Sequence, residues 1–295
     1  MTLSPRSAFT GGDNSSESMV QQFPLYITVA EGYGRLGNHL FQYASTLGIA
    51  RVQNRHIVQS PEFELRKIFD LKHKLLPYRD FRSTISRWQR IKEARFGCFQ
   101  QSLMTLPPVN IHLLGYVQSY KYFDSIQEEI RRDFTFSKSI AKKADAILRN
   151  IYATNKGYIL VGVHVRRGDF LQVQSRGYVV APASYYQKAF EWMKTTVSEN
   201  RTLFVIVSED QQWCQKMFHV HNVQILPKAD PEVHLAVLAR CSHVIMSGGT
   251  FGWWGGWLAG GYVIYFNRYM NNNTDYGGYF CPVDHYPPHW IGIGY

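Results

Sequence analysis

The feature that most restricts how this chain of 295 residues can fold is a series of apolar runs separated by longer stretches of helical periodicity. Each run is short, rich in β-branched residues and almost without polar alternation, which is typical of strands buried on both faces of a parallel sheet. Strands that alternate with helices predict a doubly wound α/β architecture. The expected strands are residues 25–30, 158–165, 203–207, 243–247 and 262–266.

Several of the intervening stretches begin with Pro, Ser or Asn, as helices often do. The expected helices are residues 38–53, 122–133, 137–152, 182–196, 211–218 and 231–241. A Lys-Gly turn at residues 156–157 precedes a new apolar strand and predicts a boundary between two α/β halves. The expected parts are therefore a disordered tail rich in Ser and Gly, an N-terminal domain and a C-terminal domain, over residues 1–22, 23–156 and 157–295.

The net charge of +10 is concentrated in the first half. Residues 1–156 carry 22 Lys and Arg against 13 Asp and Glu, whereas residues 157–295 carry 10 against 9. Much of the excess lies in residues 66–95 at amphipathic helical spacing, which favours a solvated helical face over a surface for an acidic membrane or glycan. Because no nucleic-acid-binding motif accompanies the charge, we expect no DNA or RNA partner.

Residues 244–266 form an uncharged run long enough to cross a membrane. Seven glycines interrupt it, so the sequence favours a strand, a Gly turn, a short helix, a second Gly turn and a second strand over a transmembrane helix. Trp253, Trp254 and Trp257 fall on helical spacing there and are expected in the core. No N-terminal signal peptide or membrane anchor is recognisable.

Glycine turns follow two of the predicted strands and open into helices. They are Gly-Arg-Leu-Gly-Asn-His at residues 34–39 and Ser-Gly-Gly-Thr-Phe-Gly at residues 247–252. The free backbone N–H groups at such a turn, and the positive end of the helix that follows, are suited to phosphate. The turn at residues 34–39 is not a G-x-G-x-x-G motif, and no P-loop motif occurs in the chain, so for that turn a simple tight turn is an equal alternative.

Two adjacent arginines end the strand that opens the second half, in Val-Gly-Val-His-Val-Arg-Arg-Gly-Asp at residues 161–169. Ligands of open α/β sheets bind outside these strand ends, so strand alternation directs His164 and Arg166 toward a bound pyrophosphate. Arg167 then lies on the opposite face, where an ion pair with Asp169 is the structural alternative. Asp169 itself is either a general base or a purely structural carboxylate.

Glu209 and Asp210 follow the next predicted strand, at residues 203–207. Carboxylates at such a position can accept hydrogen bonds from ribose hydroxyls or from the edge of guanine. They are as often caps of the helix that starts there. The sequence leaves both roles open.

Together these stretches resemble glycosyltransferase family eleven, the α-1,2-fucosyltransferases, and in particular the animal enzymes that make H-type fucosylated galactose. The similarity extends from Tyr26 to the end, is loosest over residues 66–110, and includes Pro-His-Trp-Ile-Gly-Ile at residues 288–293. His39 departs from the pattern, because the family commonly has Gln there, and Gly248-Gly249 replaces a bulkier pair.

The resemblance implies a GT-B-like fold of two Rossmann-like doubly wound α/β domains facing a cleft, the N-terminal one on the acceptor side and the C-terminal one binding GDP-fucose. It implies inverting, metal-independent transfer of L-fucose to the 2-hydroxyl of a galactose on a glycan, the galactose being terminal and β-linked. The chain contains no Asp-x-Asp for a divalent cation, and His219 and His221 have no third ligand nearby, so no metal and no cofactor are expected. The alternatives are transfer to another hydroxyl, and a pseudoenzyme that binds a glycan or nucleotide sugar.

The expected site falls into three groups. The catalytic residues are Arg166, His164 and Asp169. The acceptor-side residues are Arg35 and His39. The donor-binding residues are Gly37, Asn38, Arg166, Arg167, Glu209, Asp210, Gly249, Thr250 and Phe251.

The resemblance also implies the lumenal side of the Golgi, membrane association through an anchor absent from this chain, and glycosylation at Asn200 or Asn272, with a further sequon at Asn14. The pairing of the four cysteines stays open, since they are too scattered for a C-x-x-C motif. They are Cys98, Cys214, Cys241 and Cys281. The exact acceptor, the general base and the oligomeric state are also not specified by the sequence.

Overall fold

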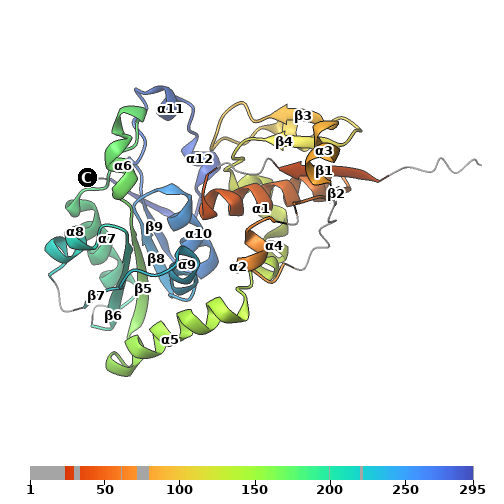
Figure 1. Ribbon diagram of the computed structural model, residues 1–295. Helices are drawn as coiled ribbons and strands as arrows, with labels where there is room; N and C mark the ends of the chain where they lie inside the picture. Colours follow the sequence, from red (N-terminus) through yellow and green to blue (C-terminus); the bar gives the residue numbers. More distant parts are fainter. Residues whose placement is uncertain are drawn as a thin grey trace, which may run out of the picture.

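The structure is a computed structural model that describes residues 24–29, 34–60, 62–71, 80–198, 200–219 and 222–294. These residues form two parallel β-sheets with helices packed on them (Figure 1). The expected α/β class is therefore confirmed. The tail predicted at residues 1–22 lies outside the described residues.

The N-terminal sheet has the strand order β2-β1-β4-β3, and all its neighbours pair in parallel. Helix α1 is almost entirely buried because it lies between this sheet and the second half (Figure 1). The strands are β1 (Leu25–Val29), β2 (Arg55–Ile57), β3 (Gln89–Lys92) and β4 (Ile111–Leu114). The helices are α1 (Leu36–Val52), α2 (Leu65–Ile68), α3 (Phe81–Ser86) and α4 (Gln127–Asp133), with 3₁₀ turns η1 (Gln101–Met104), η2 (Tyr120–Tyr122) and η3 (Asp124–Ile126).

The C-terminal sheet has the order β10-β9-β8-β5-β6-β7, again parallel throughout. Its central strands are buried along nearly their whole length, which explains why they read as continuous apolar runs. The strands are β5 (Ile159–Val165), β6 (Thr202–Ser208), β7 (Val223–Ile225), β8 (His243–Met246), β9 (Val263–Phe266) and β10 (Ile291–Ile293). The helices are α5 (Lys138–Thr154), α6 (Gly168–Gln172), α7 (Ala183–Thr196), α8 (Gln211–Met217), α9 (Pro231–Leu238), α10 (Gly249–Ala259), α11 (Asp275–Gly278) and α12 (Pro282–His285), with the 3₁₀ turn η4 (Gln174–Arg176).

The run at residues 244–266 folds as predicted, into β8, α10 and β9. Trp253, Trp254 and Trp257 are buried in the core. Among the described residues, no helix combines the length and the apolar character that crossing a membrane requires.

The solvated helical face expected over residues 66–95 is only partly present. The described parts of this stretch form α2, α3 and β3, and β3 pairs with β4 at the edge of the sheet. Charged side chains such as Arg90 and Lys92 are common on edge strands, where they oppose pairing with another chain. Part of the excess of basic residues in this stretch therefore lies on the edge strand β3.

An aromatic cluster joins the two halves into one hydrophobic core. Phe41 of α1 lies 4.5 Å from Trp253 and 5.1 Å from Trp254 of α10, measured between ring centroids. Phe123 stacks on Trp254, and the backbone carbonyl of His285 accepts a hydrogen bond from Trp253 Nε1 at 2.9 Å. Helix α5 also packs against α9, although the predicted boundary at residues 156–157 lies after α5. Side chains from both halves thus form one common core.

A disulfide between Cys98 and Cys281 fastens the C-terminal segment to the N-terminal half across 183 residues of sequence. Next to it, Asp284 of α12 accepts hydrogen bonds from Phe99 N at 2.9 Å and from Lys121 Nζ at 2.6 Å. The remaining two cysteines are free and buried. The pairing that the sequence left open is therefore settled in the structure.

We predict that replacing both Cys98 and Cys281 by Ala lowers the free energy of unfolding by about 2–5 kcal/mol, because the unfolded chain loses a long cross-link. For a chain of this size the thermal midpoint should fall by about 5–15 °C. Calorimetry of the wild type and the double variant, each with and without reductant, measures this. Reductant should lower the midpoint of the wild type alone. A wild type that is insensitive to reductant and equal to the variant contradicts the prediction.

Candidate active site

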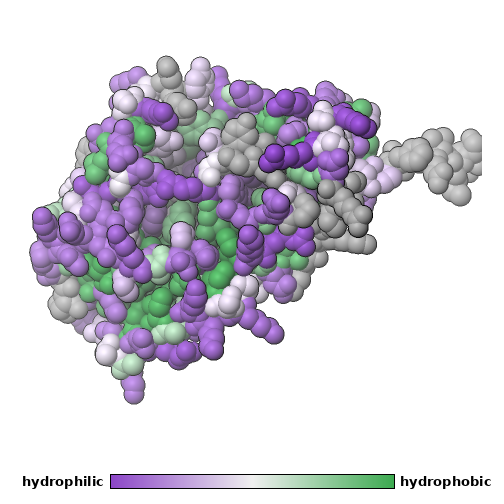
Figure 2. All heavy atoms as spheres, viewed as in Figure 1, coloured by the Kyte–Doolittle hydropathy of each residue, from purple (hydrophilic) through white to green (hydrophobic). Residues whose placement is uncertain are grey.

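An open cleft of about 1150 Å³ lies between the two halves. Its walls come from the start of α1, α2 and the segment after β4 on one side, and from the ends of β5 and β6, the start of α9 and the start of α10 on the other. Figure 2 shows a hollow in this face of the molecule, with hydrophilic residues around much of it and apolar residues within and below it. Most predicted site residues line this cleft.

The starts of α1 and α10 meet at the cleft because residue 37 is a glycine. A Cβ atom on Gly37 would lie 2.6 Å from the backbone of Thr250 and Phe251, closer than real side-chain contacts. The first N–H groups of an α-helix have no partner within the helix, and its N-terminus carries partial positive charge. Two such ends therefore face one region of the cleft.

Asn38 connects three segments around this junction. Its Oδ1 atom accepts a hydrogen bond from Thr250 Oγ1 at 3.0 Å and another from Gln118 Nε2 at 2.8 Å. The three side chains come from α1, α10 and the segment after β4, and all line the cleft. The Oδ1 atom of Asn38 thus links the two walls of the cleft.

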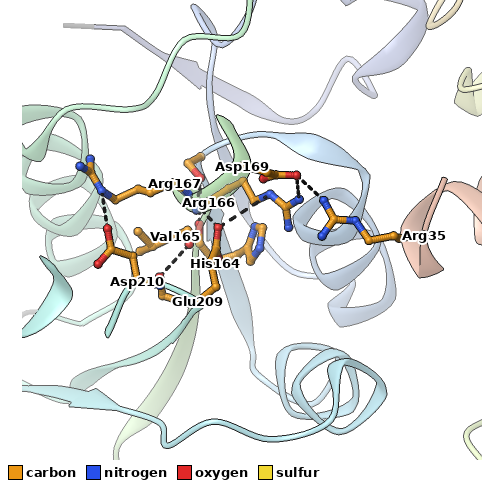
Figure 3. A network of polar contacts seen from close by, with 10 residues as sticks. Arg35, His164, Val165, Arg166, Arg167, Asp169, Glu209 and Asp210 are labelled. Carbon is orange, nitrogen blue, oxygen red and sulfur yellow. Dashed lines mark hydrogen bonds and ion pairs between the residues drawn. The ribbon is translucent and has the colours of Figure 1, made fainter. Parts of the chain in front are cut away.

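Arg166 follows directly after β5 and is held on several sides (Figure 3). Its backbone N–H donates to Ser247 Oγ at 2.8 Å, and its guanidinium donates to Asp169 Oδ2 at 2.6 Å. Glu209 Oε1 lies 3.9 Å from Arg166 Nε, and the guanidinium lies over the ring of Phe170. With a side chain that is 19% exposed, Arg166 lines the cleft in a fixed orientation.

Asp169 also binds Arg35, so guanidinium groups from both halves share one carboxylate oxygen (Figure 3). Burial raises the pKa of Asp169, but the charges and hydrogen bonds of Arg166 and Arg35 outweigh it and lower that pKa below its usual value. Asp169 therefore stays ionised at neutral pH. Of the two roles that the sequence left open for Asp169, general base and structural carboxylate, this environment fits the structural one.

The predicted ion pair between Arg167 and Asp169 is wrong. Arg167 points away from Arg166, as strand alternation predicted, and its Nε lies 3.2 Å from Asp210 Oδ2 (Figure 3). Its guanidinium also lies 4.1 Å from the ring centroid of Trp213. Asp210 in turn caps α8 by accepting a hydrogen bond from Trp213 N. Arg167 and Asp210 do not line the cleft, whereas Glu209 does.

His164 is a buried, uncharged side chain at the back of the cleft. Burial, followed by the charges of Arg166 and His234, lowers its pKa to about 3. Its ring lies 5.1 Å from that of Phe251, and Gly252 packs closely against it. A neutral imidazole beside Arg166 lets the guanidinium carry the positive charge alone.

Several residues of the cleft were not predicted from the sequence. His39 was predicted, but its partner was not: the Nδ1 atom of His39 lies 2.5 Å from Oε1 of Glu64. The other missed residues include Lys67, Tyr116, Gln118, Arg176, Lys228 and Glu232. No motif marks Tyr116 and Gln118, because β4 has only four residues and no glycine turn directly opens a helix after it.

Glu93 supports the segment that carries Tyr116 and Gln118. Its Oε2 atom accepts the backbone N–H of Tyr116 at 2.7 Å, and the N–H groups of Val117 and Gln118 also face the carboxyl group. Val117 has a φ of 43°, an unusual backbone conformation for a β-branched residue. Burial raises the pKa of Glu93 to about 7, although these N–H groups act in the opposite direction.

Two predicted glycosylation sites, Asn200 and Asn272, are exposed, whereas Asn14 lies outside the described residues. His219 is described, but His221 is not, so the structure gives no geometry for that pair. Among the described residues, three potential metal ligands come together at Cys98, Cys281 and Asp284, and the two cysteines form the disulfide.

A family model described as glycosyl transferase family 11 matches residues 17–294. The chain belongs to this family. Galactoside alpha-(1,2)-fucosyltransferase 1 of Saimiri sciureus is 30% identical over 273 residues, which cover 88% of this chain and 73% of the relative. The protein of the same name from Rattus norvegicus is 28% identical over 302 residues, which cover 98% of this chain and 78% of the relative.

Solved fucosyltransferases share the fold. NodZ alpha-1,6-fucosyltransferase soaked with GDP-fucose has a TM-score of 0.54 at 15% identity and covers 83% of this chain and 96% of its own. A mutant of Arabidopsis thaliana FUT1 in complex with GDP has a TM-score of 0.56 at 11% identity and covers 87% and 73%. The expected GT-B-like fold is therefore confirmed, as is the expectation that the chain is a glycosyltransferase.

We predict that Glu93→Gln gains stability relative to the wild type as the pH rises from 5 to 8. Because the folded-state pKa of Glu93 is raised, the folded state holds a proton that the unfolded chain releases above about pH 4.5. The stability contributed by this carboxyl group is thus complete at acid pH and lost as the pH rises through about 7. The amide cannot ionise, so the difference in free energy of unfolding should grow by about 2.5 kcal/mol between these pH values.

Denaturant unfolding at both pH values measures this difference, with the exposed Glu128→Gln as the matched control. A difference between Glu93→Gln and the wild type that does not change with pH contradicts the prediction.

Proposed function

We propose that this protein transfers L-fucose from GDP-fucose to the 2-hydroxyl of a terminal β-galactose on a glycan, with inversion at fucose C1 and without a metal ion. The observation that carries the proposal is Arg166, a guanidinium fixed in the cleft beside the converging starts of α1 and α10. As the bond from C1 to the β-phosphate breaks, negative charge grows on the leaving oxygen. A cation oriented before the reaction stabilises that charge.

The donor side of the proposal rests on the C-terminal half. Gly249, Thr250 and Phe251 present the first turn of α10 to the cleft, where backbone N–H groups are suited to a diphosphate. Gly37 and Asn38 adjoin them from α1. The GDP-fucose used with the structurally similar NodZ supports the same donor. We assign Glu209, which is next to Arg166, to the donor side as well.

The acceptor side of the proposal rests on the N-terminal half, residues 23–156, where Arg35 and His39 line the cleft. The names of the curated relatives support a galactoside acceptor and a (1,2) linkage. A cleft with walls from two halves lets the acceptor approach C1 from the side opposite to GDP, as inversion requires.

We further propose that the enzyme acts in the Golgi lumen as a membrane-associated glycoprotein. The disulfide supports an oxidising compartment, because cytosolic proteins rarely keep such bonds. The exposed sequons at Asn200 and Asn272 support glycosylation there. Protein from secretory membranes should show a glycosylation-dependent shift in gel mobility. Loss of that shift in the Asn200→Gln, Asn272→Gln double variant would identify these two residues as the glycosylation sites.

The decisive experiment is incubation of the purified protein with GDP-fucose and a panel of β-galactosides, followed by NMR analysis of the product linkage. We expect fucose α-linked to O2 of galactose. Release of GDP without a fucosylated product, or a bond to another hydroxyl, contradicts the proposal.

We predict that Arg166→Lys folds normally but loses at least about 10²-fold in kcat, because a point charge cannot reproduce the two-point hydrogen bonding of a guanidinium. The matched control is Arg167→Lys, which should retain most of its activity because Arg167 binds Asp210 away from the cleft. Steady-state kinetics and thermal midpoints measure both. If the two variants show the opposite order of activity, the roles of the arginines must be exchanged.

We predict full activity in excess EDTA, since the positive charge in the proposed mechanism comes from Arg166 and from helix N-termini. Initial rates with chelator, and after re-addition of manganese or magnesium, measure this. A rate that chelation abolishes and manganese restores contradicts metal independence.

A further inference from the structure

We propose that Glu64, held in place by His39, is the general base of the reaction. This inference rests on the proposed fucosyl transfer. In that transfer the acceptor oxygen forms a bond to fucose C1, the bond from C1 to the phosphate oxygen breaks, and GDP leaves with its electron pair. The hydroxyl proton has to go to a base near the acceptor, and a carboxylate is suited to take it.

Among the described residues, four carboxylates line the cleft, and three belong to the C-terminal half. They are Asp169, Glu209 and Glu232. The Oδ2 atom of Asp169 is bound to two guanidinium groups, and its Oδ1 atom is covered by protein and has no hydrogen-bond partner. An acceptor hydroxyl therefore cannot reach a free oxygen of Asp169 in this structure.

Glu209 and Glu232 lie with the donor-side residues. Oε1 of Glu209 accepts a hydrogen bond from the backbone N–H of Arg167 at 3.0 Å and lies 3.9 Å from Arg166 Nε. Glu209 therefore belongs to the group of charged residues around Arg166. Glu232 lies in the first turn of α9, on the C-terminal half. Neither carboxylate stands on the wall that we assign to the acceptor.

Glu64 is the fourth carboxylate and comes from the N-terminal half, just before α2. Its side chain is 48% exposed, so an acceptor can reach it. His39 Nδ1 lies 2.5 Å from Oε1, which fixes the direction of the carboxylate. Arg35, which binds Asp169, immediately precedes α1 and lies four residues before His39. Glu64 is thus connected through His39 to the helix end that carries Arg35.

Glu64 and His39 have different roles in this pair, and the role of each depends on which of its atoms can contact the acceptor. To act as the base, Glu64 has to be ionised, and the proposal therefore makes its carboxylate the acceptor and Nδ1 of His39 the donor. The other ring nitrogen, Nε2, is covered by protein and has no partner, so His39 cannot itself contact the acceptor there. Glu64 is thus the catalytic group, and His39 is a positioning residue.

The test compares Glu64→Gln with Glu62→Gln, an exposed glutamate two residues away that does not line the cleft. We expect Glu64→Gln to lower kcat by at least about 10²-fold, with unchanged affinity for GDP in calorimetry and an unchanged KM for GDP-fucose. Glu62→Gln should behave as the wild type. The acid limb of the wild-type pH–rate profile should be absent from the residual activity of Glu64→Gln.

His39 provides an independent measurement. His39→Gln keeps an N–H donor for Glu64 and should retain most of kcat, whereas His39→Ala should lower kcat with little change in GDP affinity. Equal kcat values for His39→Ala and the wild type contradict the positioning role.

Three results overturn the assignment. A Glu64→Gln enzyme with wild-type kcat removes Glu64 as the base, and one that changes only the acceptor KM makes it a binding residue. A wild type that forms no fucosylated product in the same assay contradicts the proposed function, and the base assignment falls with it.

Discussion

The direct backbone contact between α1 and α10 at Gly37 is the constraint on which the cleft depends. It brings the N-termini of two helices from different halves to one place, where Asn38 can bind Thr250 and Gln118 with the same oxygen. Any side chain at this position would push the helices apart and would disturb both walls of the cleft. The position of Arg35 opposite Arg166 follows from the same contact, because Arg35 immediately precedes α1.

The aromatic cluster around Phe41 and Trp253 makes this geometry rigid. Two α/β halves that share a core cannot turn freely against each other, so the charges around Arg166 are held in place before a ligand arrives. Such preorganisation is what electrostatic stabilisation of a leaving group needs, because groups already in place do not have to reorient during the reaction. Rigidity at the helix junction and chemistry at Arg166 are therefore two aspects of one packing arrangement.

The sequence predicted the parts of this structure that local pattern determines. The long buried strands β5 and β6, the helix between β8 and β9, and the opposite directions of Arg166 and Arg167 all follow from periodicity. Strands β2, β3, β4, β7 and β10 have three or four residues and gave no recognisable pattern. The equally short β8 and β9 were predicted because they lie in the long uncharged run at residues 244–266. Side-chain partners were least predictable: Asp169 binds Arg35 from 134 residues away, and Glu64 meets His39 only through the tertiary fold.

The disulfide also sets an order of events during synthesis of the chain. Cys98 is made 183 residues before Cys281, which at ordinary elongation rates is about 10–40 s earlier. For most of that interval the N-terminal half lacks the tryptophans of α10, and throughout it lacks α12, so the aromatic side chains of α1 that they cover stay uncovered. A nascent chain of this kind presents both a reduced thiol and an apolar surface to the folding machinery until Cys281 and α12 emerge.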